Sequence, residues 1–342
     1  MKCVFKDILE IKNGKNQKNV ENSDGVYPIY GSGGIMGYAD DYICPSDTVI
    51  IGRKGNINSP IYVEEPFWNV DTAFGLIANR KYLIAKYLFY FCKKFNFEKL
   101  NKAVTIPSLT KSDLLEIKID LPDKSSQQLI VDRLNTVERV IELRQQELSQ
   151  LDNLIKARFV ELFGDVVLND KHWETQEFSK VTDSRLGKML DAKRQTGQSS
   201  FPYLANANVQ WFRFEVDCLN EMDFNEAEQK EFALEEGDLL VCEGGEIGRC
   251  AIWHNQVQPC FFQKALHRVR CKQGIILPDY LAWWFKFNCE NNGFTAIEGA
   301  KATIAHLPGA KLKKLRVVIP PLSLQNQFVD FVTQVDKSKV VA

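Results

Sequence analysis

The longest regular pattern of apolar positions in the chain runs from residue 130 to residue 162. Ser125 followed by Gln128 matches the capping box that opens a helix, and Gly164 is the residue type that commonly follows a helix end. Only Arg144 and Arg158 interrupt the seam. A 3.5-residue period sustained over roughly 38 residues predicts a long helix that packs against another helix. The seam consists of Ile130, Leu134, Val137, Ile141, Leu148, Leu151, Ile155 and Leu162.

A second helix with the same seam is predicted close to residue 342. After two consecutive prolines, Phe328, Val332 and Val335 occupy the positions that match the start of the first seam. The sequence ends at Ala342, so we expect this helix to be about half as long as the first. Two helices with matching seams are expected to pair with each other.

The sequence also aligns with itself in five collinear blocks, which indicates one domain present twice. The offset between the copies grows from 173 (178 minus 5) to 198 (303 minus 105), as expected when the second copy has acquired insertions. Chance could produce a single match but does not easily produce five in the same order. The blocks are Phe5, Ile8, Gly14 and Lys15 with Phe178, Val181, Gly187 and Lys188; Tyr27-Pro28 with Phe201-Pro202; residues 47–50 with 238–241; Tyr87-Leu88 with Tyr280-Leu281; and residues 105–122 with 303–320.

Each copy mixes short strands with helices, which predicts an α/β (α+β) fold. Residues 48–51 and 239–242 are brief apolar runs that lead into glycine-containing turns, a pattern typical of buried strands. Residues 81–94 and 278–287 are predicted helices rich in aromatic side chains, and Pro278 suits the first helical position. We expect these aromatic side chains to form core rather than to stack on bases.

Composition narrows the function classes further. A chain of 342 residues with 45% hydrophobic residues can form two domains. A net charge of -1 argues against a protein that coats nucleic acid nonspecifically, because such proteins carry a basic excess. Nine cysteines without a C-x-x-C pair suit neither a disulfide framework nor a zinc site. No apolar run is long enough to span a membrane, so we expect a cytoplasmic protein without a membrane partner.

Signatures of catalysis are missing from the sequence. There is no G-x-x-x-x-G-K-[ST] motif for a nucleotide and no Asn-Pro-Pro-Phe or Asp-Pro-Pro-Tyr motif of a methyltransferase. Residues 31–37 come close to G-x-G-x-x-G, but the last glycine is displaced by one residue and no strand and helix flank the loop. The four histidines have no metal-ligand or triad spacing. The sequence therefore predicts neither a catalytic centre nor a metal site.

Two homologous domains, each followed by a helix, resemble the specificity subunit of Type I restriction-modification enzymes. The glycine-rich residues 27–38 (YPIYGSGGIMGY) resemble a loop of many target-recognition domains. Ala305 departs from the proline of the first copy, and the short second helix departs from the usual layout. The stretches most typical of the family are TIPSL at 105–109, IKIDLP at 117–122 and Gln127-Gln128, repeated as TIAHL at 303–307, LRVVIPP at 315–321 and Gln325.

The resemblance implies two target-recognition domains, residues 1–124 and 164–322, separated by an antiparallel pair of long helices, residues 125–163 and 323–342. It implies that each domain reads one half of a bipartite site in double-stranded DNA. The helices would dock two modification subunits and set the spacer, with restriction subunits joining the full complex. Methylation and cleavage would belong to these partners. S-adenosylmethionine, ATP and Mg would be bound by them as well, so that this chain holds no cofactor.

Candidate DNA contacts lie in polar loops, because base reading in the major groove uses Arg or Lys for guanine, Asn or Gln for adenine and acidic groups for cytosine. The same scaffold with different side chains is what two different half-sites require. In the first copy the candidates are Gly33, Gly34, Arg53, Lys54, Asn56 and Asn58; in the second they are Glu243, Glu246 and Arg249, with Asn206, Asn208, Gln263 and Lys264 as weaker ones. Lys102 and Thr105, repeated as Lys301 and Thr303, are expected to contact phosphate.

Two other functions are compatible with parts of this pattern. A methyltransferase or nuclease fused to one recognition domain would show cofactor binding or activity in the isolated chain, and the missing motifs argue against it. A structural adaptor with two degenerate DNA-binding folds would show no preference for specific over nonspecific DNA once a modification subunit is present. For any single candidate residue, a solvated polar turn remains the alternative interpretation.

Overall fold

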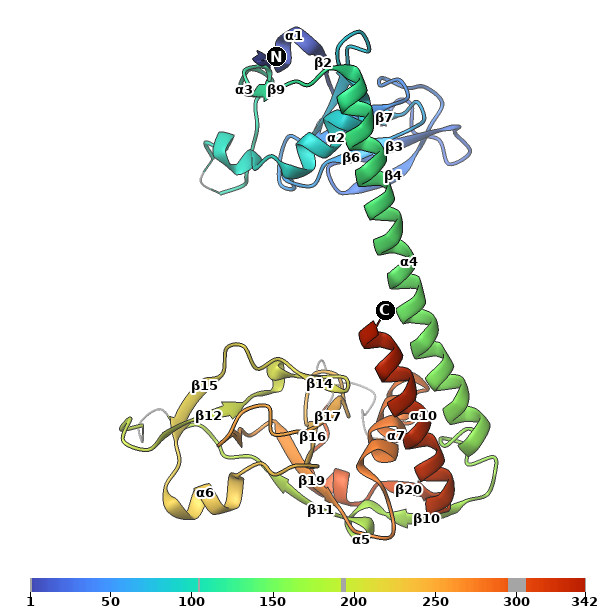
Figure 1. Cartoon of the computed structure of the whole chain (residues 1–342), viewed down its shortest axis with the longest axis vertical. Coiled ribbons are helices and arrows are strands. Elements are labelled where there is room, and N and C mark those ends of the chain that lie inside the picture. Colours follow the sequence, from blue (N-terminus) through green and yellow to red (C-terminus); the bar gives the residue numbers. More distant parts are fainter. Residues whose placement is uncertain (1, 104, 192–194, 295–305, 342) are drawn as a thin grey trace. The chain divides into compact units, whose positions relative to one another are not determined.

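The computed structural model describes residues 2–103, 105–191, 195–294 and 306–341 (Figure 1). The chain divides into two compact units, Met1–Leu143 and Arg144–Ala342, and the division falls inside helix α4 (Lys124–Phe163). In the described part of the chain, no helix is long and apolar enough to cross a membrane. Within these same ranges, no cluster of His, Cys, Asp or Glu side chains could hold a metal ion.

The first unit contains two small sheets and one separate strand pair. One sheet is antiparallel, and in the other β3 pairs in parallel with β7 and antiparallel with β4. The first sheet has the order β2 (Leu9–Asn13), β8 (Ala73–Ala78), β5 (Thr48–Gly52), β6 (Ile61–Val63); the second has the order β4 (Gly34–Ala39), β3 (Tyr27–Gly31), β7 (Trp68–Asn69); and β1 (Lys2–Val4) pairs with β9 (Lys118–Asp120). The helices are α1 (Phe5–Ile8), α2 (Ala85–Lys94), the 3-10 helix η1 (Phe97–Leu100) and α3 (Lys111–Leu115).

The second unit repeats this topology, which confirms the duplication predicted from the sequence. Its sheets have the orders β11 (Thr182–Leu186), β19 (Leu266–Cys271), β16 (Leu239–Cys242), β17 (Cys250–Ile252) and β15 (Asn220–Asp223), β12 (Ser200–Leu204), β18 (Phe261–Phe262); the strand pair is β10 (Glu174–Glu177) with β20 (Arg316–Ile319). Helices α5 (Phe178–Val181), α7 (Pro278–Glu290) and α9 (Gly309–Lys313) take the places of α1, α2 and α3.

Insertions distinguish the second unit from the first. Two residues connect β3 to β4, whereas residues 205–219 connect the equivalent strands β12 and β15. This longer connection holds η3 (Asn206–Asn208) and the hairpin of β13 (Val209–Gln210) and β14 (Arg213–Phe214). Helix α6 (Glu226–Phe232) follows β15. These segments account for most of the increase in the repeat offset.

The central strands of both sheets are buried, as predicted. All five residues of β5 and all four of β16 are buried, and the aromatic side chains of α7 lie in the core with β16, with Trp283 and Trp284 buried. Helix α2 begins at Ala85, four residues later than predicted, because the N–H of Ile84 donates to the buried side chain of Gln127 instead of a helical carbonyl.

Strand registers correct one block of the internal alignment. Ala73 and Leu266 are equivalent, because each carbonyl accepts the N–H of a repeat glycine, Gly14 and Gly187 respectively. Gly52 pairs with Ala73 and Cys242 pairs with Leu266. The alignment of Asp47 with Asp238 was therefore wrong by one residue, and Thr48 is the true equivalent of Asp238. Similar apolar runs cannot be told apart from a version shifted by one residue without their partner strands.

Helix α4 starts one residue before the predicted capping box. The carboxylate of Asp123 accepts the backbone N–H of Ser126 at 2.9 Å and the hydroxyl protons of Ser125 and Ser126, so Asp123 is the cap. These bonds, that of the Ser125 hydroxyl first, lower the Asp123 pKa to about 2. The predicted capping box of Ser125 with Gln128 was wrong. The other end is confirmed: α4 stops at Phe163, and Gly164 has a φ of +74°.

The second long helix, α10 (Leu322–Val341), pairs antiparallel with the second half of α4 (Figure 1). The rings of Phe159 and Phe328 are 5.4 Å apart, and the Lys339 ammonium lies 2.8 Å from the Asp152 carboxylate. Later positions of α10 thus meet earlier positions of α4, which confirms the predicted pairing within the second unit.

A buried glutamine secures the start of each long helix. In the first unit, Gln127 accepts the N–H of Ile84 and donates to the carbonyls of Tyr82 and Pro122. Gln325 repeats this pattern in the second unit, with Leu277 as donor and Ile275 and Pro320 as acceptors. Each glutamine therefore hydrogen-bonds to two backbone groups of the segment before the aromatic helix, α2 or α7. It also bonds to the carbonyl of the proline that follows β9 or β20.

We expect Gln127→Leu to lower the free energy of unfolding of the first unit by about 3 kcal/mol, because three backbone groups lose their partner in a buried site. Urea unfolding, monitored through hydrogen exchange of the amides of the first unit, measures this change. Gln128→Leu is the matched control, because Gln128 is exposed and its side chain, among the described residues, bonds only to Asp132. Equal stability of the two variants would contradict the assignment.

Candidate nucleic-acid interface

The turn that follows β5, residues 53–58, is the most firmly held loop among the sequence candidates of the first unit. The N–H groups of Arg53 and Lys54 both donate to the Thr72 carbonyl. The Arg53 carbonyl accepts the N–H of Leu109, and the Pro107 carbonyl accepts the N–H of Gly55. This β5 turn is thus bonded on one side to the start of β8 and on the other to the family-typical stretch 105–109.

The side chains of the β5 turn differ in how free they are to bind a ligand. Arg53 is exposed, with its guanidinium 3.4 Å from the Asp71 carbonyl. Lys54 and Asn56 are exposed, and neither has a side-chain bond to another described residue. Asn58 accepts the N–H of Phe97 at 2.7 Å and so holds the start of η1. Arg53, Lys54 and Asn56 are therefore exposed in the same turn, and Asn58 supports it.

The other candidates of the first unit lie at separate positions. Gly33 lies in the tight turn between β3 and β4 and Gly34 begins β4; Gly34 has a φ of +123°, and a Cβ at either position would meet only open space. Backbone could approach a ligand closely there. Lys102 pairs with Asp113 at 2.8 Å, and Thr105 is exposed. Lys301 and Thr303 lie outside the described residues.

The turn that follows β16, residues 243–249, has the same backbone connections as the β5 turn. The N–H of Glu243 donates to the Ala265 carbonyl, and its carbonyl accepts the N–H of Leu307. A β-bridge joins Gly244 to His306, as one joins Lys54 to Ser108 in the first unit. Arg53 and Glu243 therefore occupy equivalent positions, and a basic turn in one unit corresponds to an acidic turn in the other.

The inserted segment of the second unit is bonded to this β16 turn. Asn206 donates to the Gly244 carbonyl at 3.2 Å, and the Arg249 guanidinium donates to the Asn206 carbonyl. The Glu246 carboxylate accepts the indole N–H of Trp211 at 2.8 Å. The structure thus brings Asn206, Glu246 and Arg249 together, as a packed cluster with part of its hydrogen-bonding capacity already used.

The remaining candidates of the second unit have different surroundings. Asn208 closes the base of the β13–β14 hairpin, because it accepts the N–H of Ala205 and donates to the Glu215 carbonyl. Gln263 and Lys264 form the turn before β19, and the side chain of Lys264 is exposed. The N–H of Lys264 donates to the Lys188 carbonyl at 2.7 Å, so this turn adjoins the loop that precedes β12.

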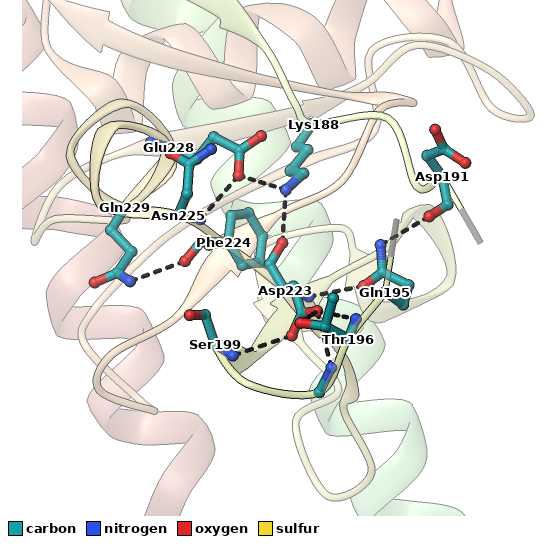
Figure 2. A network of polar contacts seen from close by, with 11 residues as sticks. Lys188, Asp191, Gln195, Thr196, Ser199, Asp223, Phe224, Asn225, Glu228 and Gln229 are labelled. Atoms are coloured by element: carbon teal, nitrogen blue, oxygen red, sulfur yellow. Dashed lines mark hydrogen bonds and ion pairs between the residues drawn. The ribbon is translucent and has the colours of Figure 1, made fainter. Parts of the chain in front are cut away.

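A polar network missed by the sequence reasoning holds that loop (Figure 2). The Lys188 ammonium donates to the Glu228 carboxylate and to the Asp223 carbonyl, both at 2.6 Å, and lies 4.9 Å from the Phe224 ring centre. With a side chain only 16% exposed, Lys188 is a fixed anchor rather than a free surface cation. Its match with Lys15 was visible in the sequence, but its partners are distant in the chain.

Asp223 secures the far end of the same loop. Its carboxylate accepts the N–H groups of Thr196, Gly197 and Ser199 and the Thr196 hydroxyl, and the Thr196 N–H bond is the main reason that the Asp223 pKa is lowered. The equivalent aspartate of the first unit, Asp40, accepts the side-chain amide of Asn22 at 3.0 Å. Both units thus use an aspartate at the end of equivalent strands to hold the same loop.

We expect Asp223→Asn to speed amide hydrogen exchange at Thr196, Gly197 and Ser199 by about 10-fold or more, because charge-assisted hydrogen bonds to these groups are lost. Hydrogen exchange of the folded chain followed by NMR or mass spectrometry measures this. Asp217→Asn, at an exposed position of the same unit, is the control. Unchanged exchange in Asp223→Asn would mean that the loop does not depend on the carboxylate charge.

Comparison with known proteins connects this arrangement to a family. The chain is 25% identical over 341 residues to S.HindORF215P of Haemophilus influenzae, covering 95% of this chain and 85% of that protein. It is 22% identical over 318 residues to the EcoKI specificity subunit of Escherichia coli K12, covering 85% of this chain and 68% of that subunit.

The fold has a counterpart among solved structures as well. The S subunit of a type I restriction-modification system from M. genitalium superimposes with a TM-score of 0.60 at 15% identity, over 99% of this chain and 90% of that one. The family described as Type I restriction modification DNA specificity domain matches residues 3–153 and again 170–340. The chain therefore belongs to this family of non-catalytic DNA specificity subunits of type I restriction-modification enzymes.

Proposed function

We propose that each unit of this chain reads one half of a bipartite site in double-stranded DNA, and that the β5 turn and the β16 turn carry the base contacts. The observation that supports this most strongly is the equivalence of the two turns. Their backbones make matching hydrogen bonds to the segments around Leu109 and Leu307, whereas their side chains differ in charge. Two turns with the same backbone structure but different side chains are suited to the recognition of two different half-sites.

Side-chain chemistry assigns roles within the turns. Arg53 and Lys54 suit guanine, and Asn56 suits adenine, because these groups match the donor and acceptor edges of those bases in the major groove. Glu243 and Glu246 at the equivalent positions suit the amino group of cytosine. Gly33 and Gly34 would allow close approach of backbone to the duplex. Thr105, Lys102 and the repeated Lys301 and Thr303 would contact phosphate.

The weaker candidates differ in how well their surroundings suit a DNA contact. Arg249 and Asn206 bond to each other, so we assign them to shaping the β16 turn rather than to reading bases. Lys264 is exposed and suits a phosphate or base contact beside Gln263. Asn58 and Asn208 are committed to local backbone groups, which favours a supporting role for both.

We further propose that residues 1–124 and 164–322 are the two target-recognition domains and that α4 and α10 dock two modification subunits, with restriction subunits in the full complex. Exposed apolar side chains on α4 support a docking role: Val137, Ile141 and Leu148 are 53%, 50% and 38% exposed. Such side chains favour burial against another protein. Methyl transfer and cleavage would then take place on the partner subunits.

We expect Arg53→Ala to weaken recognition of one half-site and to leave the other unchanged, because the β5 turn belongs to one unit only. Loss of a bidentate base contact costs about 1 to 3 kcal/mol. Methylome mapping of cells that express the variant with its modification subunit measures the effect at each base position. Arg80→Ala is the control, because Arg80 is exposed and follows the end of β8 that lies away from the β5 turn.

A uniform loss of affinity for every DNA sequence in Arg53→Ala would make Arg53 a phosphate contact instead. Loss at both half-sites would contradict the assignment of one half-site to each unit.

We expect an insertion of four residues after Leu148 to lengthen the gap between half-sites by one or two base pairs. Four residues add about 6 Å of helix and slightly more than one turn, so the seam is nearly preserved. Base pairs are about 3.4 Å apart. The insertion point also precedes Asp152, which pairs with Lys339 of α10. Methylome mapping tests this: an unchanged gap, or changed bases within a half-site, would show that α4 does not set the spacer.

A further inference from the structure

The tip of the β3–β4 hairpin in the first unit carries two consecutive exposed apolar side chains. Ile35 and Met36 are 55% and 61% exposed, and they directly follow Gly33 and Gly34. Tyr38, two residues further along β4, is 45% exposed. A single exposed apolar side chain is ordinary on a protein surface, whereas several together mark a surface that binds something.

A β-bulge determines how these side chains leave the hairpin. The pairing of β3 with β4 shifts by one residue between Ile29 and Tyr30, so that Tyr30 pairs with Ile35 and Met36 has no partner. An extra residue of this kind bends its strand and changes the direction of the side chains around it. A Cβ on Gly31 would lie 2.7 Å from the Met36 sulfur, so the glycine leaves the space in which the Met36 side chain crosses the hairpin tip.

The hairpin tip adjoins the β5 turn. A Cβ on Gly52, the last residue of β5, would lie 3.1 Å from the Cβ of Ser32 in the hairpin. The Tyr30 carbonyl accepts the N–H of Val70, which lies two residues before the carbonyl to which the β5 turn donates. The exposed apolar tip and the exposed side chains of the β5 turn are therefore neighbours within one compact unit.

The equivalent position of the second unit is covered. There β12 and β15 pair without a register shift. The equivalent prolines of β3 and β12 pair with Tyr38 and Glu221, so Leu219 corresponds to Met36. Leu219 is partly buried against the core of the second unit. The two copies of the domain thus differ at this place as they do in the β5 and β16 turns, which suits a role in specificity rather than in folding.

The surroundings of the tip favour DNA as the group that covers it. Arg53 and Lys54 are exposed cations in the adjoining turn. Pairing with β7 ends at Tyr30, so the tip beyond it is a two-stranded ribbon, and the major groove admits a two-stranded ribbon. The apolar group that base pairs present in that groove is the 5-methyl group of thymine, and apolar side chains contact it.

We propose that Ile35 and Met36 read a thymine through its 5-methyl group, so that the first unit requires an A·T pair in one orientation at one position of its half-site. The inference deepens the proposed function and rests on the assignment of one half-site to the first unit. It adds an apolar contact to the charged and amide contacts of the β5 turn. Orientation is fixed because A·T and T·A place the methyl group at different points of the groove.

Deoxyuridine provides the probe, because it lacks the 5-methyl group of thymidine but keeps the same hydrogen-bonding edges. Methylome mapping of the wild type and of Arg53→Ala first identifies the site and the half-site that the first unit reads. Each thymine of the site is then replaced in turn by deoxyuridine in a synthetic duplex. Fluorescence anisotropy measures the affinity of each duplex for the complex of this chain with its modification subunit. We expect one replacement, in the half-site changed by Arg53→Ala, to weaken binding about fourfold, as burial of one methyl group gives.

Variants of the hairpin assign the effect to its tip. The double variant Ile35→Ala, Met36→Ala should bind the thymine and deoxyuridine duplexes with equal affinity. Both side chains are exposed, so the variant should remain folded. Val26→Ala is the matched control, because Val26 is 79% exposed and precedes β3 at the end of the hairpin away from the tip. It should keep the preference of about fourfold for thymine.

Three results would overturn the inference. If every deoxyuridine duplex binds the wild-type complex as the unmodified duplex does, no methyl group is read, and the effect of Arg53→Ala on one half-site still stands. If the preference for thymine persists in the double variant, another side chain contacts the methyl group. If the double variant, but not Val26→Ala, fails to copurify with the modification subunit, the tip binds a protein instead of DNA.

Discussion

Backbone hydrogen bonding around the turn after the central strand is the constraint on which the proposed interface depends. In each unit the turn residue, Arg53 or Glu243, donates its N–H to the strand on one side and accepts the N–H of Leu109 or Leu307 on the other. Because these bonds use only main-chain atoms, the side chains can change without changing the loop. The family-typical stretch around residue 107 therefore has a structural reason: it is the second support of the turn.

In the second unit, an inserted segment adds polar side chains to the equivalent turn. Its insertion at residues 205–219 packs on the β16 turn. There Asn206 donates to the Gly244 carbonyl, Trp211 donates to the Glu246 carboxylate, and Arg249 donates to the Asn206 carbonyl. The loop before β12 is held separately, by Lys188 at one end and Asp223 at the other. Rigid loops lose little conformational entropy when they bind, so this bonding pattern suits a recognition surface.

The apolar seam of α4 is packed differently in its two halves. From Leu151 onward α4 is part of the core of the second unit, where Phe159 and Phe163 meet α7 and α10. Before that point most of its apolar side chains are partly exposed, although the heptad pattern continues with an interruption only at Arg144. The pattern specifies that a face will be covered, and in the second unit α7 and α10 cover it.

The sequence by itself determined the features that depend on local pattern: the duplication, the buried strands, the end of α4 at Gly164, and the position of the two turns. It could not determine the start of α4, because Ser125 and Asp123 both suit a cap and only the folded backbone selects Asp123. Nor could it determine the register of Thr48 with Asp238, because a run of similar apolar residues acquires its register from the neighbouring strand. The roles of Asn58, Lys188 and Asp223 were likewise decided by tertiary structure, since each bonds to groups from 24 to 40 residues away in the chain. Hydrogen-bond partners at such separations leave no periodic trace in a sequence, and so only the fold shows which polar side chains support the loops and which remain free to bind.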